Sequence, residues 1–279
     1  MLVTTGCSFV WGDELEGYDQ NPPTHWKHTF THKLAEHLGV KYNNMGSCGA
    51  SNHKIFRDLS MWFNGKAPKW IYKQDGKLAT PENTTHMVVL WSAWQREELP
   101  FAIDKSVEDD FNIMRFEGIT QYSPIRVDTV GYFDEKLRET IKDWYIVNKH
   151  NRRYLQQQLP YMIAVQTMCK AHNIKLLQGC FHDVMWRDVV AVMLDKEPLW
   201  KDHNKLLSDM VGCLEPYSRI GLSKHRTIHN FCTHRNIDGQ PERDLLPYGH
   251  PNEITQTHYA EYLKELFESE YRETVERPF

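Results

Sequence analysis

The chain has 279 residues and a formal net charge of −4 at neutral pH, which argues against a protein built mainly to hold nucleic acid. Hydrophobic residues make up 41% and charged residues 25% of it, a balance typical of globular proteins. No stretch approaches the roughly 18 uninterrupted apolar residues of a membrane span. The N-terminus lacks the basic and apolar regions of a signal peptide. We therefore expect a cytoplasmic protein that engages neither nucleic acid nor membrane, with its six cysteines reduced.

The first third of the chain alternates short apolar runs with helical patterns. Strands are expected at residues 2–5, 40–43 and 86–91, and helices at 25–38 and 51–63. The run at 86–91 is continuously apolar, as in a strand buried on both faces. Asp75-Gly76 favours a tight turn between two short strands, so a hairpin insertion is predicted at about 68–82.

The remainder of the chain is less regular. Residues 100–132 carry few periodic cues, and 185–245 is expected to be an irregular insertion that is helical at first. A helical pattern over 135–172 is expected to break at Pro160. A strand is expected at 174–178, and a closing helix should run from the N-cap Asn252 to about Glu270.

Strands separated by helices predict an α/β fold with a parallel sheet and helices on both faces. The sequence shows no internal repeat, low-complexity tract or linker. A single domain that spans residues 1–279 and carries insertions is therefore expected.

A serine stands where the first strand should end. Ligands of open parallel sheets bind at the carboxyl ends of the strands, and Ser8 directly follows that strand. Gly6 lets the chain turn sharply, and Gly12 permits close approach of the backbone. Such a serine can present its hydroxyl as a nucleophile and its own N–H to an oxyanion. From this motif alone, a loop serine that caps the next segment is the simpler interpretation.

The pattern Asn44-x-Gly46-x-x-Gly49-x-Ser51 follows the second strand and opens a helix. Gly49 would place a bare backbone N–H at the helix start, which suits an anion. A phosphate could equally bind there. However, the segment lacks the G-x-G-x-x-G pattern of a dinucleotide site and the Lys-Ser/Thr of a P-loop.

His250 lies immediately before the closing helix and is followed by Pro251. A histidine followed by proline at a helix entrance is held in position, although alone it would suggest a structural or surface residue. The ordered combination of Ser8, the glycine-rich turn and His250 within a βαβ pattern indicates a nucleophile and its base.

Gly6-Cys7-Ser8, the segment 44–49 and His250-Pro251 resemble the first, second and last conserved blocks of the SGNH/GDSL hydrolase family. The opening GCSFVWGDEL is similar to SGNH-like proteins encoded by tailed phages, including cyanophages. The resemblance implies a flavodoxin-like three-layer α/β/α sandwich and an esterase or carbohydrate O-deacetylase. A phage-encoded protein would be found in the host cytoplasm or the virion.

The resemblance also implies roles for single residues. Ser8 would attack the acyl carbonyl, and His250 would take the serine proton and return it to the leaving group. The N–H groups of Ser8 and Gly49 would bind the oxyanion. The substrate would be an acyl ester of a small molecule or polysaccharide, and no cofactor or metal is implied.

Two departures concern the first and last blocks. Cys7 stands where the family usually has Asp, next to the nucleophile. The family places an acid three residues before its catalytic histidine, where this chain has Pro247. Asp244 is the first candidate for a substitute acid and Asp183 the second. A dyad of Ser8 and His250, supported by a backbone carbonyl, is the remaining possibility.

A third departure follows the long buried strand, where the family supplies an Asn side chain to the oxyanion hole. This chain has no Asn there, and Ser92 or Gln95 is expected to donate instead. Arg96 would bind an anionic part of the substrate or pair with an acid. Trp94 and Trp11 are candidate substrate contacts, although core packing accounts equally well for tryptophans.

Three alternatives stay open. The pattern His225-x-x-x-His229-x-x-Cys232-x-His234 has ligand types suited to zinc, but a polar loop is its commoner cause. A catalytically weakened SGNH fold could serve as a carbohydrate-binding or virion structural protein, as the missing acid and missing Asn suggest. The same catalytic pair could also act as an acyltransferase.

Overall fold

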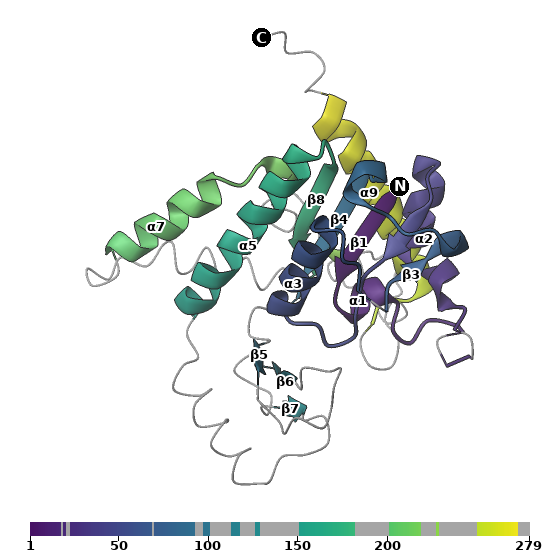
Figure 1. Ribbon diagram of the computed structural model, residues 1–279, viewed down its shortest axis with the longest axis horizontal. Coiled ribbons are helices and arrows are strands. Elements are labelled where there is room, and N and C mark those ends of the chain that lie inside the picture. Colours follow the sequence, from purple (N-terminus) through teal and green to yellow (C-terminus); the bar gives the residue numbers. More distant parts are fainter. Residues whose placement is uncertain are drawn as a thin grey trace, which may run out of the picture.

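The computed structural model describes residues 1–17, 19–20, 23–68, 70–92, 97–100, 113–117, 126–128, 151–181, 201–218, 227–228 and 250–272. At its centre lies a five-stranded sheet in the order β3-β2-β1-β4-β8 (Figure 1). These strands are β1 (Leu2–Gly6), β2 (Tyr42–Asn44), β3 (Tyr72–Lys73), β4 (His86–Trp91) and β8 (Lys175–Cys180). All are parallel to their neighbours except β3, which pairs antiparallel with β2.

Helices cover both faces of this sheet (Figure 1). The described helices are α1 (Ser8–Trp11), α2 (Phe30–Leu38), α3 (Asn52–Phe63), α5 (Asn151–Ala171), α7 (Lys201–Gly212) and α9 (Glu253–Arg272). The chain moves one way across the sheet from β1 to β2 and the other way from β2 to β4, so right-handed crossovers place α2 and α3 on opposite faces. α9 packs on α2, and α5 packs on α3. The predicted three-layer α/β/α sandwich is confirmed.

Short polar residues begin the helices where the sequence predicts them. The Ser51 hydroxyl accepts a hydrogen bond from the Lys54 N–H at the start of α3, and the Asn252 side chain accepts one from the Thr255 N–H at the start of α9. The first predicted helix is split. A 3-10 turn, η1 (His25–His28), comes first, and Thr29 then caps α2.

The predicted hairpin at 68–82 is wrong. Asp75 and Gly76 do form a turn with positive φ, within the 3-10 turn η2 (Gln74–Gly76). The strand before it, β3, pairs with β2 instead. The residues after it are held by a side chain, because the Asn43 amide donates to the Lys77 carbonyl and accepts from the Ala79 N–H. A side-chain amide thus takes the place of a second strand.

Pro160 does not break its helix. α5 continues through it from Asn151 to Ala171. Because Pro160 lies on the exposed side of the helix, water can satisfy the carbonyl that loses its N–H partner. The predicted part at 135–150 lies outside the described residues.

A second, antiparallel sheet begins just before the stretch expected to be irregular, residues 100–132, and occupies part of it. It contains β5 (Glu97–Pro100), β6 (Ile113–Glu117) and β7 (Arg126–Asp128) in that order. Within the predicted insertion at 185–245, the described elements are α7 and the 3-10 turn η5 (Pro216–Ser218). No helix in the described part of the chain is long and apolar enough to cross a membrane.

The core lies on both sides of the central strands. Val88, Val89, Leu90 and Trp91 of β4 are fully buried, as predicted for a strand covered on both faces. The backbone packs tightly against this core at Gly6. A Cβ atom there would lie 2.6 Å from the Leu90 carbonyl oxygen and 2.5 Å from Val10 Cγ2.

The close approach at Gly6 makes a testable prediction for stability. In Gly6→Ala the new methyl group meets the backbone of β4, which cannot move without disturbing the sheet. We expect a loss of about 1–3 kcal/mol in the free energy of unfolding, measured by urea denaturation. Gly212→Ala is the matched control, since nothing lies within 4 Å of a Cβ atom at that position. Equal stability of the two variants would contradict this account of the core.

Candidate active site

Ser8 and His250 meet above the carboxyl end of β1. Ser8 is the first residue of α1, a single helical turn that begins just after β1 ends. Its Oγ lies 2.9 Å from Nε2 of His250. The chain leaves β1 toward β2 on one side and leaves the neighbouring β4 toward β8 on the other side. This edge is therefore the switch point where open α/β sheets bind ligands. The Ser8 side chain is nearly buried, and the His250 side chain is 16% exposed.

The second ring nitrogen of His250 contacts a carboxylate. Glu14 Oε2 lies 2.6 Å from His250 Nδ1, and the Glu14 side chain is 14% exposed. A carboxylate can only accept, so Nδ1 carries the hydrogen, and in the neutral imidazole Nε2 keeps its lone pair. The Ser8 hydroxyl then donates to Nε2. This is the hydrogen-bond order of a serine–histidine–acid triad.

A tight turn after α1 places Glu14 next to His250. Gly12 ends α1 in the left-handed conformation, and its N–H donates to the Ser8 carbonyl. Glu14 itself has a φ of 64°, which is uncommon for a residue with a side chain. Such backbone strain is typical of functional sites, where the surrounding structure holds it in place.

The glycine-rich segment after β2 supports the helix that carries Ser8. The Asn44 amide donates to the Val10 carbonyl at 2.7 Å and accepts from the Gly46 N–H at 2.8 Å. Both contacts lie in the buried interior. Asn44 therefore joins the second sequence block to the first, and positions α1 over the end of β1.

The imidazole of His250 is held between a helix start and an aromatic ring. Pro251 is buried, and Asn252 caps α9 directly after it. The Phe9 ring lies 5.4 Å from the His250 ring, centroid to centroid, and 4.7 Å from the ring of Phe181 at the end of β8. These contacts restrict the directions in which the imidazole can turn.

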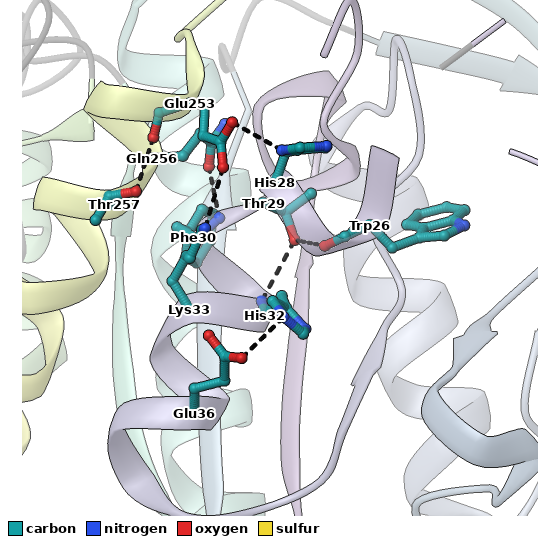
Figure 2. Close-up of polar contacts among 10 residues, drawn as sticks. All are labelled: Trp26, His28, Thr29, Phe30, His32, Lys33, Glu36, Glu253, Gln256 and Thr257. Carbon is teal, nitrogen blue, oxygen red and sulfur yellow. Dashed lines mark hydrogen bonds and ion pairs between the residues drawn. The ribbon is translucent and has the colours of Figure 1, made fainter. Parts of the chain in front are cut away.

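The first turn of α9 is tied to η1 and α2 (Figure 2). A Glu253 carboxylate oxygen lies 2.8 Å from Nδ1 of His28, and the same carboxylate forms an ion pair with Lys33 at 3.1 Å. The buried Gln256 accepts from the Phe30 N–H at 2.8 Å and donates to the Phe9 carbonyl at 3.4 Å. These contacts connect α9, the helix that follows His250, with both α2 and α1. They therefore help to hold His250 close to Ser8.

The oxyanion donors predicted from the sequence stay predictions. Gly49 lies in a turn with a φ of 65°, before α3 rather than at its first residue. Ser92 is fully buried at the end of β4, and its backbone N–H donates to the Asn52 side chain at 2.7 Å. The same Asn52 side chain donates to the Ser92 carbonyl at 3.0 Å. Asn52 thus ties the start of α3 to the end of β4, where the expected donors lie.

Several predicted site residues cannot be placed. Trp94, Gln95, Arg96, Asp183 and Asp244 lie outside the described residues, as do the four candidate zinc ligands His225, His229, Cys232 and His234. Within the described ranges there is no group of three or more His, Cys, Asp or Glu residues that could hold a metal ion.

Trp11 is described, and it packs into an aromatic cluster. Its ring lies edge-on to Trp26 at 4.3 Å and 5.9 Å from His25. Trp11 remains partly exposed. Burial lowers the pKa of His25, opposed by a hydrogen bond with the Trp11 backbone and by the charge of Asp13. Burial therefore favours the neutral form of the His25 imidazole. Trp11 stays a predicted substrate contact.

Sequence reasoning missed Glu14 and Asn52. Glu14 lies six residues after Ser8, in the sequence Gly12-Asp13-Glu14. The feature that could have identified it is a pair of acidic residues directly after a turn glycine. The resemblance to the SGNH/GDSL family points instead to an acid near His250, where that family has its own. Asn52 carried no signal, since an Asn in the first turn of a helix is ordinary.

Comparison with known proteins finds no matching family model and no matching curated protein. Solved structures with a similar course of the chain include a protein from Desulfitobacterium hafniense assigned to the G-D-S-L lipolytic family (9% identity, 95% of this chain and 97% of that one, TM-score 0.42). Others are a Corynascus thermopiles carbohydrate esterase family 2 enzyme with a carbohydrate-binding domain (12% identity, 96% and 65%, TM-score 0.41), and an acetyl xylan esterase from Butyrivibrio proteoclasticus (12% identity, 96% and 63%, TM-score 0.41). This chain spans about two thirds of the two esterases.

Proposed function

We propose that the protein is a serine hydrolase of the SGNH type that cleaves a carboxylic ester. The observation that carries this proposal is the continuous hydrogen-bonded chain from Ser8 through His250 to Glu14. The proposed base lies within hydrogen-bond reach of the proposed nucleophile on one side and of the orienting acid on the other. All three lie at the sheet edge where such folds bind ligands. In this proposal Glu14 takes the role that the sequence assigned to Asp244.

The chemistry follows from the tautomer that Glu14 favours. As Ser8 Oγ attacks the acyl carbon, its proton passes to His250 Nε2. The imidazolium formed is stabilised by the Glu14 carboxylate on Nδ1. The alcohol then leaves with the proton from Nε2, and an acyl group remains on Ser8. The N–H groups of Ser8 and Gly49 are the proposed donors to the oxyanion.

Esters of small molecules and polysaccharides are the proposed substrates. Acetylated sugars are the first candidates to test, since carbohydrate esterases are among the structures with a similar course of the chain. The alternative of a weakened fold that only binds its ligand loses one of its two supports, because His250 does have a carboxylate partner.

Ester hydrolysis by matched proteins tests the proposal. We expect the wild-type protein to hydrolyse p-nitrophenyl acetate, and acetylated xylan is the polymeric substrate to compare. In His250→Ala the serine has no base, and turnover should fall by at least about 10³-fold. Retained circular dichroism would show that the variant is folded. Equal rates for the two proteins, or no hydrolysis of any ester in a substrate panel, would contradict the proposal.

A further inference from the structure

A second carboxylate lies beside the catalytic nitrogen of His250. Asp13 Oδ2 is 3.7 Å from Nε2, and the Asp13 side chain is 22% exposed. Asp13 is the neighbour of Glu14 in the turn after α1, and its N–H donates to the Ser8 carbonyl at 3.2 Å. The two consecutive acids therefore face different nitrogens of the same ring.

These two positions imply two different tasks. Glu14 lies on Nδ1, where it orients the ring, whereas Asp13 lies near Nε2, where the proton is exchanged. At 3.7 Å Asp13 is beyond hydrogen-bond distance from Nε2, and the Ser8 hydroxyl holds that nitrogen at 2.9 Å. Asp13 is thus close enough to contact whatever molecule hydrogen-bonds to Nε2 after Ser8 has been acylated.

We propose that Asp13 is a catalytic residue that accepts a hydrogen bond from the water molecule that hydrolyses the acyl-enzyme. The inference rests on the proposed function. A water molecule has two hydrogens. During attack its oxygen faces the acyl carbon, and one of the two hydrogens passes to His250. A water about 2.8 Å from both Nε2 and Asp13 Oδ2 gives one hydrogen to each. Its lone pairs are then left for the acyl carbon.

The deacylation step balances with these groups alone. The water oxygen bonds to the acyl carbon while one water proton moves to His250 Nε2. The tetrahedral intermediate then collapses, the bond from carbon to Ser8 Oγ breaks, and the proton on Nε2 passes to Oγ. The acid is released and Ser8 is restored. Asp13 holds the second hydrogen of the water throughout and gains no proton.

This arrangement favours water over an alcohol as acceptor of the acyl group. An alcohol has one hydroxyl hydrogen, which must point to Nε2, so it has none to offer to Asp13. A carboxylate close to the attacking alcohol would then lack a donor and would be partly desolvated, which is unfavourable. Asp13 therefore distinguishes a hydrolase from an acyltransferase built on the same pair of Ser8 and His250.

Pre-steady-state kinetics with p-nitrophenyl acetate separate the two steps. In Asp13→Ala we expect acylation within about threefold of wild type and deacylation slower by about 10- to 100-fold, as for loss of a hydrogen bond to a charged group. The variant should then release about one equivalent of nitrophenolate in a burst. Its kcat and KM should fall together while kcat/KM changes little. With methanol added, the fraction of product that is methyl acetate should rise.

Two further variants keep this test decisive. Asp13→Asn retains an acceptor oxygen and should give an intermediate deacylation rate. Glu16→Ala removes an exposed carboxylate nearby and should leave acylation and deacylation unchanged. The inference is overturned if Asp13→Ala deacylates at the wild-type rate, or if both steps slow equally. A wild-type protein that forms no acyl-enzyme would instead overturn the proposed function, and the inference with it.

Discussion

The Ser8→Ala variant is expected to fold normally and to lose about 10⁶-fold in kcat for ester hydrolysis, as serine hydrolases do when the nucleophile is removed. The hydroxyl is the atom that bonds to the acyl carbon, and neither His250 nor Glu14 can replace it. Alanine is smaller than serine and favourable in a helix, so α1 and its contacts should persist. The measurement is steady-state hydrolysis of p-nitrophenyl acetate, with urea denaturation as the test of folding.

Ser92→Ala provides the comparison for Ser8→Ala. Ser92 is also a buried serine at the carboxyl end of a central strand, and it is proposed only as an oxyanion donor. Its loss should cost far less than the loss of Ser8. If the two variants lost activity equally, or if Ser8→Ala kept its activity, another residue would have to be the nucleophile.

The Glu14→Gln variant is expected to bind substrate normally and to lose about 10³- to 10⁴-fold in kcat. An amide at this position can present its N–H₂ group to Nδ1, which favours the tautomer with the hydrogen on Nε2. His250 could then no longer accept the Ser8 proton, and the imidazolium would lose its counter-charge. The side chain keeps its size, so the strained turn at Glu14 and the stability should change little. Kinetics and urea denaturation, measured side by side, test both statements.

Asp244→Asn is the matched control for Glu14→Gln. Asp244 is the acid that the position of the family's last block suggested, whereas the geometry favours Glu14. We expect Asp244→Asn to keep wild-type kcat. The opposite pattern, with activity lost at Asp244 and kept at Glu14, would return the role of the orienting acid to Asp244.

The general architecture was predictable because it depends on patterns that many residues share. The continuous apolar run of β4 and the caps at Ser51 and Asn252 identify buried strands and helix starts. The meeting of Ser8 and His250 was predictable for a related reason. A strand end and the entrance of the last helix fall on the same edge of a parallel sheet, whatever the length of the chain between them.

The predictions that failed depended on single side chains. The hairpin failed because one amide, that of Asn43, satisfies the backbone where a strand was expected. The break at Pro160 failed because the proline faces solvent, where water can replace the lost hydrogen bond. Neither the hydrogen bonds of Asn43 nor the solvent exposure of Pro160 produces a periodic pattern in the sequence. The carboxylate partner of His250 was not predicted for a similar reason, since the turn at Gly12 that places Glu14 next to His250 is formed by backbone conformations.

Expectations outside the described residues, and those on origin and location, stay predictions. This holds for the resemblance to phage-encoded proteins, for cytoplasmic or virion location and for the single-domain organisation. It also holds for the contacts proposed for Trp94 and Arg96. The proposed function depends on none of them.

The most direct measurement is covalent labelling with a fluorophosphonate probe, followed by mass spectrometry of the digested protein. If His250 and Glu14 activate Ser8, the wild-type protein should take up one probe molecule on the peptide that carries Ser8, and Glu14→Gln should label far more slowly. No label, or a label on another serine while Ser8 stays free, would contradict the account.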